Sequence, residues 1–264
     1  MKTTPCLLAA LVLAATASTT TAATTFSFIT DVWTNGSTTQ KGYKDEATSG
    51  TLTKDGITMT FQNSYAGTAV ASTRNLTLDF GNPTGFVLGT KNDANNLTGT
   101  LVNYQRWDFS FSQPVVLNSL GLDDVDSDKS NLSGTDGFRD AIAAEAFFTT
   151  APGTIGTGLD AVFLFTPTTG LSGGTIATGG GQTIPYVISG PANNPNNDPA
   201  FRTFITFGDT PVTSFSIYSF SDRVNSHRVS LFQGVIEISQ PAVPEPSTSL
   251  LGLLALPLMM KRRR

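Results

Sequence analysis

Short runs of alternating apolar and polar residues cover the chain from about residue 24 to residue 240. In each run the apolar side chains recur at every second position, which is the period of a strand that buries one face. The clearest runs span residues 76–80, 107–111, 142–148, 162–164, 204–206, 215–217, 229–231 and 235–238. Gly, Pro, Asn and Asp separate them, so this part of the chain is predicted to be all-β.

Residues 51–61 give the most specific local prediction. Asp55 and Gly56 separate two alternating runs, and this dipeptide is typical of a two-residue hairpin turn because glycine tolerates the positive φ that the turn needs. In the resulting register Leu52 pairs with Met59 on the face that also carries Ile57, while threonines line the other face. We therefore predict a β-hairpin here.

The frequent turn signals predict one domain over residues 24–240, a β-sandwich of the jelly-roll type rather than a parallel α/β fold. Residues 139–146 suit a short helix by composition, but their alternation favours a strand. Two stretches predict long exposed loops, 166–183 because of its Gly and Thr and 190–199 because of its Asn and Pro. Such loops are either plain connections or functional excursions.

The charge of the chain is low and unevenly placed. Charged residues make up only 14% of it, and between residues 3 and 260 the sequence has 20 acidic and 11 basic residues, a net charge of −9. Nucleic acids and anionic lipids need clustered Lys and Arg, so neither is an expected partner. Divalent cations and neutral sugars are compatible with this charge.

Residues 1–23 have the organisation of a secretory signal peptide. Lys2 supplies the positive start, residues 7–15 form an apolar stretch too short to span a bilayer, and small residues allow cleavage after Ala17, Ala22 or Ala23. A buried N-terminal helix is the alternative. Cys6, the one cysteine, lies inside this segment, so the exported protein is expected to have no disulfide.

Residues 241–264 form a tail with three parts. A proline-rich box comes first, the apolar residues 247–260 follow, and four cations end the chain; the box is Val243, Pro244, Glu245 and Pro246, and the cations are Lys261, Arg262, Arg263 and Arg264. The prolines keep the box extended and accessible to a protease. As a helix, the apolar run reaches about 21 Å against a hydrocarbon core of about 30 Å, so it predicts a short transmembrane helix. The terminal cations resist translocation and place the preceding chain outside the cytoplasm.

This tail resembles the PEP-CTERM sorting signal of Gram-negative bacteria, which has the same three parts in the same order. The resemblance covers residues 243–264 only. It implies that the protein is a substrate of an exosortase, a membrane protease that cuts near the Pro-Glu-Pro box, in bacteria that build an exopolysaccharide or biofilm matrix. The implied route is an inner-membrane-anchored precursor that is then delivered to the cell surface or matrix. A plain C-terminal membrane anchor is the alternative.

Residues 123–128 are the stretch most suggestive of metal binding. Four aspartates lie within these six residues, and Asp136 and Asp140 follow. Calcium takes six to eight oxygen ligands, so Asp124, Asp126 and Asp128 are candidate ligands of a structural calcium ion. Lys129 and Thr135 occupy positions where an EF-hand requires Gly and Glu, which excludes that motif. A solvated acidic loop is the other interpretation.

Catalytic signals are weak, and we assign no catalytic residues. His227 is the only histidine, so a multi-histidine zinc site is excluded and a Ser-His-Asp triad would depend on it. Glu145 and Glu237 fall in predicted strands and are the acids considered for glycoside hydrolysis. We therefore expect a protein that is not an enzyme.

The aromatic residues support the main alternative function, which is carbohydrate binding. The side chains that could stack on sugar rings are Trp33, Trp107, Tyr65, Tyr104, Tyr186 and Tyr218, although aromatic residues are as often core residues. The expected function is therefore structural or adhesive in the envelope or in an exopolysaccharide matrix. A carbohydrate-binding module is the first alternative, with its ligand site unknown, and a secreted hydrolase is the second.

Overall fold

The computed structural model describes residues 23–72, 76–79, 85–127, 139–165, 170–190, 199–223 and 227–241. The regular structure of these residues consists of strands, apart from η1 (Pro199–Phe201), a single 3₁₀ turn. The strands form one large connected sheet whose strand pairings are antiparallel. The predicted all-β class is confirmed. No helix among the described ranges is long and apolar enough to cross a bilayer.

The sheet branches at β9 (Tyr104–Asp123), a strand of 20 residues. Its first half pairs with β5 on one side, as far as Phe111, and with β16 on the other, as far as Ser110, with one further β16 pair at Val115 after a register shift. Its second half, after Pro114, pairs with β15 on one side and with β17 and β18 on the other. Proline has no N–H to give to a strand neighbour, so Pro114 suits the point where β9 changes partners.

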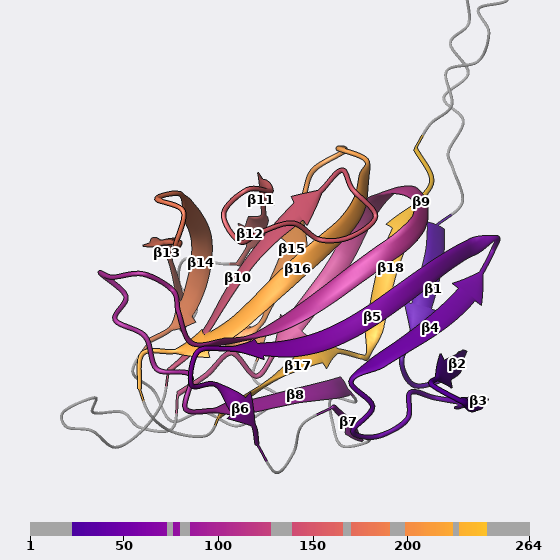
Figure 1. Cartoon of the computed structure of the whole chain (residues 1–264), viewed down its shortest axis with the longest axis horizontal. Coiled ribbons are helices and arrows are strands. Elements are labelled where there is room, and N and C mark those ends of the chain that lie inside the picture. The colour runs from indigo at the N-terminus through magenta and orange to yellow at the C-terminus, as the bar shows by residue number, and fades with distance from the viewer. Residues whose placement is uncertain are drawn as a thin grey trace, which may run out of the picture. The chain divides into compact units, whose positions relative to one another are not determined.

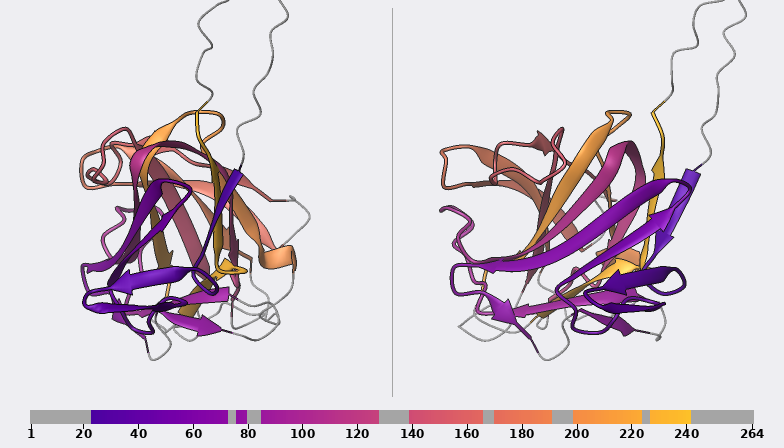
Figure 2. Two further views of the ribbon diagram at one scale, coloured as in Figure 1. Left: turned by 90° about the vertical axis from the view of Figure 1, so that its right-hand side faces the viewer. Right: turned by 45° about the vertical axis from the view of Figure 1, so that its right-hand side comes forward.

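The first half of β9 belongs to a wide group of neighbouring strands (Figure 1). In spatial order this group is β3 (Thr38–Lys41), β2 (Val32–Asn35), β4 (Ser49–Lys54), β5 (Ile57–Ala66), β9, β16 (Val212–Ser221), β10 (Asp140–Phe147), β14 (Thr183–Ser189) and β13 (Leu171–Ala177), with β11 (Leu159–Asp160) beside the end of β10. The β13–β14 hairpin lies at the edge beyond β10 (Figure 1), at the left of the right-hand view of Figure 2.

The second half of β9 belongs to a narrower group. Its members are β12 (Val162–Leu164), β15 (Thr203–Thr206), β9, β17 (His227–Phe232) and β18 (Val235–Ser239), followed by β8 (Gly85–Lys91) with β6 (Val70–Ala71) and β7 (Thr77–Asp79) against β17, and by β1 (Ala23–Ser27) against β18. The first and last strands of the body are therefore direct neighbours.

One hydrophobic core contains side chains from both groups. Phe109 of β9 stacks on Phe215 of β16, with ring centroids 4.6 Å apart. Phe28 stacks on Phe86 of β8 at 4.4 Å and contacts Phe61 of β5 edge-on at 5.4 Å. These rings are essentially fully buried and connect the two groups through apolar contact.

A second, smaller core covers the opposite face of β10 and β16. Its buried members are Leu101, Ala141, Ala143, Ile176, Ile184, Ile188, Tyr218 and Phe220. Because both faces of β10 are covered, all eight of its residues are buried and its sequence does not alternate cleanly. The predicted preference for a strand over residues 139–146 is confirmed.

The predicted hairpin over residues 51–61 is confirmed. Leu52 pairs with Met59, and both are buried with Ile57 while the threonines on the other face remain accessible. Asp55 and Gly56 have φ angles of 51° and 75°, as a two-residue turn of this type requires.

Three of the strand predictions are wrong in detail. Phe148 is 67% exposed because β10 ends at Phe147. Val162 and Leu164 of β12 point outward, and Phe163 packs on the core instead. In β15 the buried residues are Thr203 and Ile205 rather than Phe204, so both short strands present the face opposite to the predicted one.

One predicted loop is also partly wrong. The stretch 166–183 contains β13, whose Leu171 and Ile176 are buried, and residue 183 already begins β14. Residues 166–169 lie outside the described residues, as do residues 191–198 of the second predicted loop.

Candidate functional site

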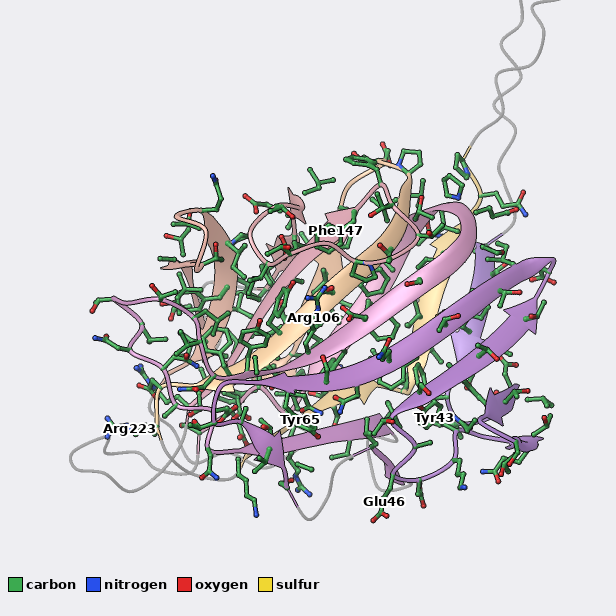
Figure 3. The ribbon with its side chains drawn as sticks, in the orientation of Figure 1. Tyr43, Glu46, Tyr65, Arg106, Phe147 and Arg223 are labelled. Atoms are coloured by element: carbon green, nitrogen blue, oxygen red, sulfur yellow. The ribbon has the colours of Figure 1, made fainter. Side chains whose placement is uncertain are left out.

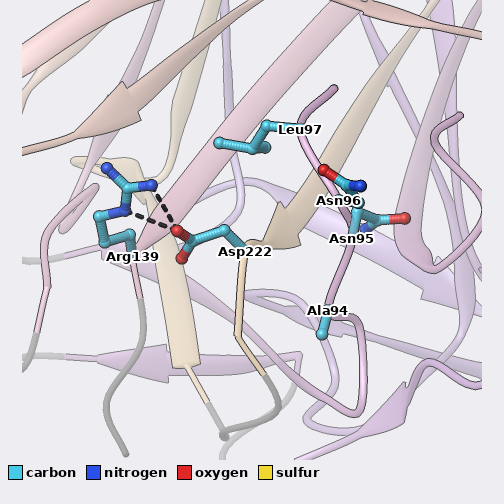
Figure 4. Close-up of a pocket in the computed structure, with 6 residues that line it drawn as sticks. All are labelled: Ala94, Asn95, Asn96, Leu97, Arg139 and Asp222. Atoms are coloured by element: carbon cyan, nitrogen blue, oxygen red, sulfur yellow. Dashed lines mark hydrogen bonds and ion pairs between the residues drawn. The ribbon is translucent and has the colours of Figure 1, made fainter. Parts of the chain in front are cut away.

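An open pocket of about 550 Å³ lies between the loop that precedes β9 and the adjoining ends of β10 and β16. It is lined by Ala94, Asn95, Asn96, Leu97, Arg139 and Asp222 (Figure 4). Arg139 directly precedes β10 and Asp222 directly follows β16, and these strands pair at Asp140 and Ser221. The Nε of Arg139 donates to Oδ2 of Asp222 at 2.8 Å, and a second guanidinium nitrogen contacts the same oxygen.

The loop that forms one wall of the pocket is held by the side chain of Asn95. Its Nδ2 donates to the carbonyls of Asp93 and Asn103 at 2.8 and 2.5 Å. Its Oδ1 accepts from the backbone N–H groups of Val102 and Asn103, both at 3.0 Å. The Asn95 backbone N–H donates to the carbonyl of Ser221 at 2.8 Å. The buried side chain of Asn95 therefore provides hydrogen-bond partners for the backbone groups of the loop, and the backbone N–H of Asn95 attaches the loop to β16. These bonds fix the position of this wall although it is not a strand.

The rim of the pocket is made by the next two residues. Oδ1 of Asn96 accepts from the backbone N–H and the hydroxyl of Thr98 at 3.1 and 2.9 Å, which orients the exposed amide. Leu97 is half-buried against the smaller core. The rim thus combines an oriented polar group with a fixed apolar one.

Buried aspartates lie on the segments behind the pocket. Asp124, Asp126 and Asp140 come together as the sequence suggested, and Asp93 joins them; each is at most 7% exposed. The N–H of Asp140 donates to the carbonyl of Asp126 at 2.8 Å. Burial first, and then the charges of the other three aspartates, raise the pKa of Asp140 well above its usual range. The folded structure therefore favours the protonated form of Asp140 more than the unfolded chain does.

The predicted calcium ligands are only partly brought together. Asp124 forms an ion pair with Arg228, with Nε and Oδ2 3.2 Å apart, and Asp128 lies outside the described residues. Among the residues described, no three His, Cys, Asp or Glu side chains converge on a metal position. Calcium binding therefore stays a prediction. Asp93 was missed because it is distant in sequence and joins the others only through the tertiary fold.

The two tryptophans are core residues. Trp33 and Trp107 are both 0% exposed, and Nε1 of Trp33 donates to the carbonyl of Ser27 at 2.9 Å. Their suggested role as sugar-stacking platforms is therefore wrong. Tyr104 and Tyr186 remain half-accessible, next to the buried rings of Tyr218 and Phe220 respectively.

A polar network crosses the middle of the wide group around Arg106 (Figure 3). The Nε of Arg106 lies 2.7 Å from Oδ1 of Asp108. A further guanidinium nitrogen donates to the Gly153 carbonyl at 2.8 Å and to the Ser216 hydroxyl at 3.1 Å. Arg106 also lies over the ring of Tyr218, 5.5 Å from its centroid. Because its Nε and Nη2 groups are engaged within the protein, Arg106 acts as a structural tie between β9, β16 and the loop after β10.

Glu145 has a structural environment rather than a catalytic one. It is fully buried and accepts from the Tyr218 hydroxyl at 2.6 Å and from the N–H groups of Gly156 and Gly158 at 3.0 and 2.9 Å. Burial raises the pKa of Tyr218; the charge of Arg106 opposes this shift and that of Glu145 adds to it. The Tyr218 hydroxyl therefore keeps its proton and donates it in the hydrogen bond to Glu145. Glu237 is half-exposed on β18, in the other strand group, so the two glutamates do not form a catalytic pair.

The remaining sequence-derived sites lie outside the described residues. These are the predicted leader up to residue 22, the side chain of His227, and the whole sorting tail from Val243 to Arg264. Asp222, the acid nearest His227 in sequence, is engaged by Arg139. No protein-family model, curated protein or solved structure matches this chain.

Proposed function

We propose that this protein is an exported, non-enzymatic component of the cell envelope or of an exopolysaccharide matrix, with a structural or adhesive role. Residues 1–23 direct export, and residues 241–264 hold the precursor at the inner membrane until an exosortase-like protease acts at Val243 to Pro246. The processed protein then reaches the cell surface or the matrix.

The observation that carries this proposal is the pairing of the first and last strands of the body. Ala23 of β1 pairs with Ser239 of β18, and Phe26, Ile236 and Ile238 of these strands are fully buried. The leader and the tail therefore flank a body that is complete without them. A body of this kind suits removal of both ends, because cleavage after Ala17 or Ala22 leaves β1 whole and cleavage after Ala23 removes only its first pair.

We further propose that the body is a two-layer β-sandwich, with the wide and narrow strand groups as its layers. The stacking of Phe28 on Phe86, and the edge contact of Phe28 with Phe61, support this arrangement because they join residues of both groups in one core. Shared burial of this kind stabilises two packed sheets without a disulfide.

The sorting step is tested in the producing bacterium with two variants, one with alanines at Pro244, Glu245 and Pro246 and one without Lys261 to Arg264. The expected result is a precursor that accumulates in the inner membrane, with the intact mass of the uncut chain. Gln240→Ala, just outside the box, is the matched control and should be processed normally. Unchanged maturation and release of both tail variants would overturn the proposal.

Carbohydrate binding is the second candidate function, and the pocket bounded by Arg139 and Asp222 favours it. A pocket of about 550 Å³ falls within the range of small-molecule sites. The hydrolase alternative lacks comparable support, because the buried carboxylate of Glu145 is occupied by its three protein donors.

A further inference from the structure

We propose that the pocket lined by Ala94 to Leu97, Arg139 and Asp222 binds a neutral saccharide and gives the protein its adhesive function. The inference rests on the proposed role in an exopolysaccharide matrix. It adds to that role a defined site and a class of ligand.

The charge of the pocket selects a neutral ligand. Arg139 is paired with Asp222, whose second carboxylate oxygen lies 3.9 Å from Nε of Arg223. Among the residues that line the pocket, the one cation, Arg139, is therefore in contact with the one anion, Asp222. Asp93, buried on the adjoining segment, and the net charge of −9 over residues 3–260 disfavour an anionic ligand. Neutral hydroxyl groups are not repelled by these negative charges.

The polar groups at the pocket match the hydrogen-bonding capacity of sugar hydroxyls. Arg139 has five N–H donors, of which Asp222 engages two. The amide of Asn96 offers N–H donors at the rim, and the carboxylate of Asp222 can accept. A hydroxyl both donates and accepts, so adjacent hydroxyls of one sugar ring can use a guanidinium and a carboxylate together. Leu97 supplies an apolar surface for the C–H face of the ring.

The site is also fixed before any ligand binds. The four side-chain hydrogen bonds of Asn95 hold the loop, and the ion pair fixes Arg139 against Asp222. A wall that is already ordered loses little conformational entropy on binding, and this favours affinity for a weakly interacting neutral ligand.

The test is calorimetric titration of the purified exported protein with neutral hexasaccharides built from glucose, mannose or galactose. At least one should bind at micromolar to millimolar concentration. Asn96→Ala should weaken that binding about tenfold or more without changing the melting temperature, because Asn96 is exposed. Gln40→Ala, an exposed amide on β3, is the matched control and should bind as the native protein does.

A second variant tests the charge argument. Asp222→Asn keeps the shape of the side chain but leaves the charge of Arg139 uncompensated. This variant should lose affinity for the neutral sugar at least about tenfold and gain binding of an oligogalacturonate, which the native protein should not bind.

Three results would overturn the proposal: no binding of any neutral hexasaccharide, native affinity in Asn96→Ala, or preferential binding of the oligogalacturonate by the native protein. Each leaves the sorting proposal intact, because sorting is read from processing of the tail variants and not from sugar binding.

Discussion

Buried charges in this protein are shared among several partners. Asp123, at 1% exposure, is 3.0 Å from a guanidinium nitrogen of Arg202, whose guanidinium also lies 3.7 Å from the ring centroid of Phe232. Glu145 is satisfied by one hydroxyl and two backbone donors. Removing one member of such a group leaves the others buried without compensation, so single substitutions should be costly here.

Glu145→Gln should lower the free energy of unfolding by about 1–3 kcal/mol. A carboxylate accepts all three hydrogen bonds, whereas the NH₂ of glutamine turns a donor toward donors. Urea unfolding measures the loss, and faster amide exchange at Gly156 and Gly158 should accompany it. Glu237→Gln, half-exposed on β18, is the control and should change stability by less than about 0.5 kcal/mol. Equal effects of the two substitutions would contradict the structural role of Glu145.

Asp140→Asn should change how stability depends on pH. The pKa of Asp140 is raised in the folded state from 3.8, so between that value and the raised pKa the folded protein binds a proton that the unfolded chain has lost. Native stability therefore falls as pH rises through this window, and the asparagine variant lacks this loss. Urea midpoints between pH 4 and 8 should shift progressively in favour of Asp140→Asn. Exposed Asp160→Asn is the control, and parallel curves for Asp140→Asn and the native protein would refute the prediction.

At the scale of single elements, the backbone angles of a turn affect the stability of the hairpin that it closes. Gly56→Ala should destabilise the β4–β5 hairpin by about 1–2 kcal/mol, because φ at this position is +75° and a Cβ is strained there even in open space. Gly179→Ala, also in open space but without a positive φ, should be close to neutral. Thermal unfolding of both variants measures the contrast, and equal stabilities would show that the turn does not require glycine.

A strand with one buried and one accessible face could be predicted from the sequence. The edge strand β12 and the glycine-containing strand β13 could not. The β4–β5 hairpin alternates because one of its faces is accessible. Strand β12, at an edge, packs only Phe163 against the core, and its two exposed apolar residues, Val162 and Leu164, suggested the wrong face. Strand β13 resembles a loop in sequence because it contains two adjacent glycines, and its buried residues Leu171 and Ile176 lie on opposite faces, in the larger and the smaller core respectively.

The candidate site could be predicted only in fragments for a related reason. The acidic run at residues 123–128 is visible in the sequence, but Asp93 and the counter-ion Arg228 come from distant segments. Likewise, Arg139 and Asp222 meet only because β10 and β16 are antiparallel neighbours. Pairings of this kind follow from strand order, which local patterns do not encode.

At the scale of the whole molecule, the effect of calcium on the melting temperature tests the prediction that the acidic run at residues 123–128 binds this ion. If calcium binds the folded body only, concentrations about 100-fold above Kd should raise the melting temperature by about 5–10 °C. Asp126→Asn should reduce the shift, and magnesium is the ionic control. The calcium prediction fails if neither added calcium nor a chelator moves the transition.

The pairing of Ala23 with Ser239 also sets the timing of folding. Strand β18 is the last element of the body to be synthesised, and β1 has no other strand partner among the described pairings. The N-terminal edge must therefore wait for nearly the whole polypeptide to emerge before it can dock. If the chain follows the proposed sorting route, closure of the body coincides with the arrival of the apolar residues 247–260 at the translocation channel. Release from the membrane then follows completion of the fold rather than preceding it.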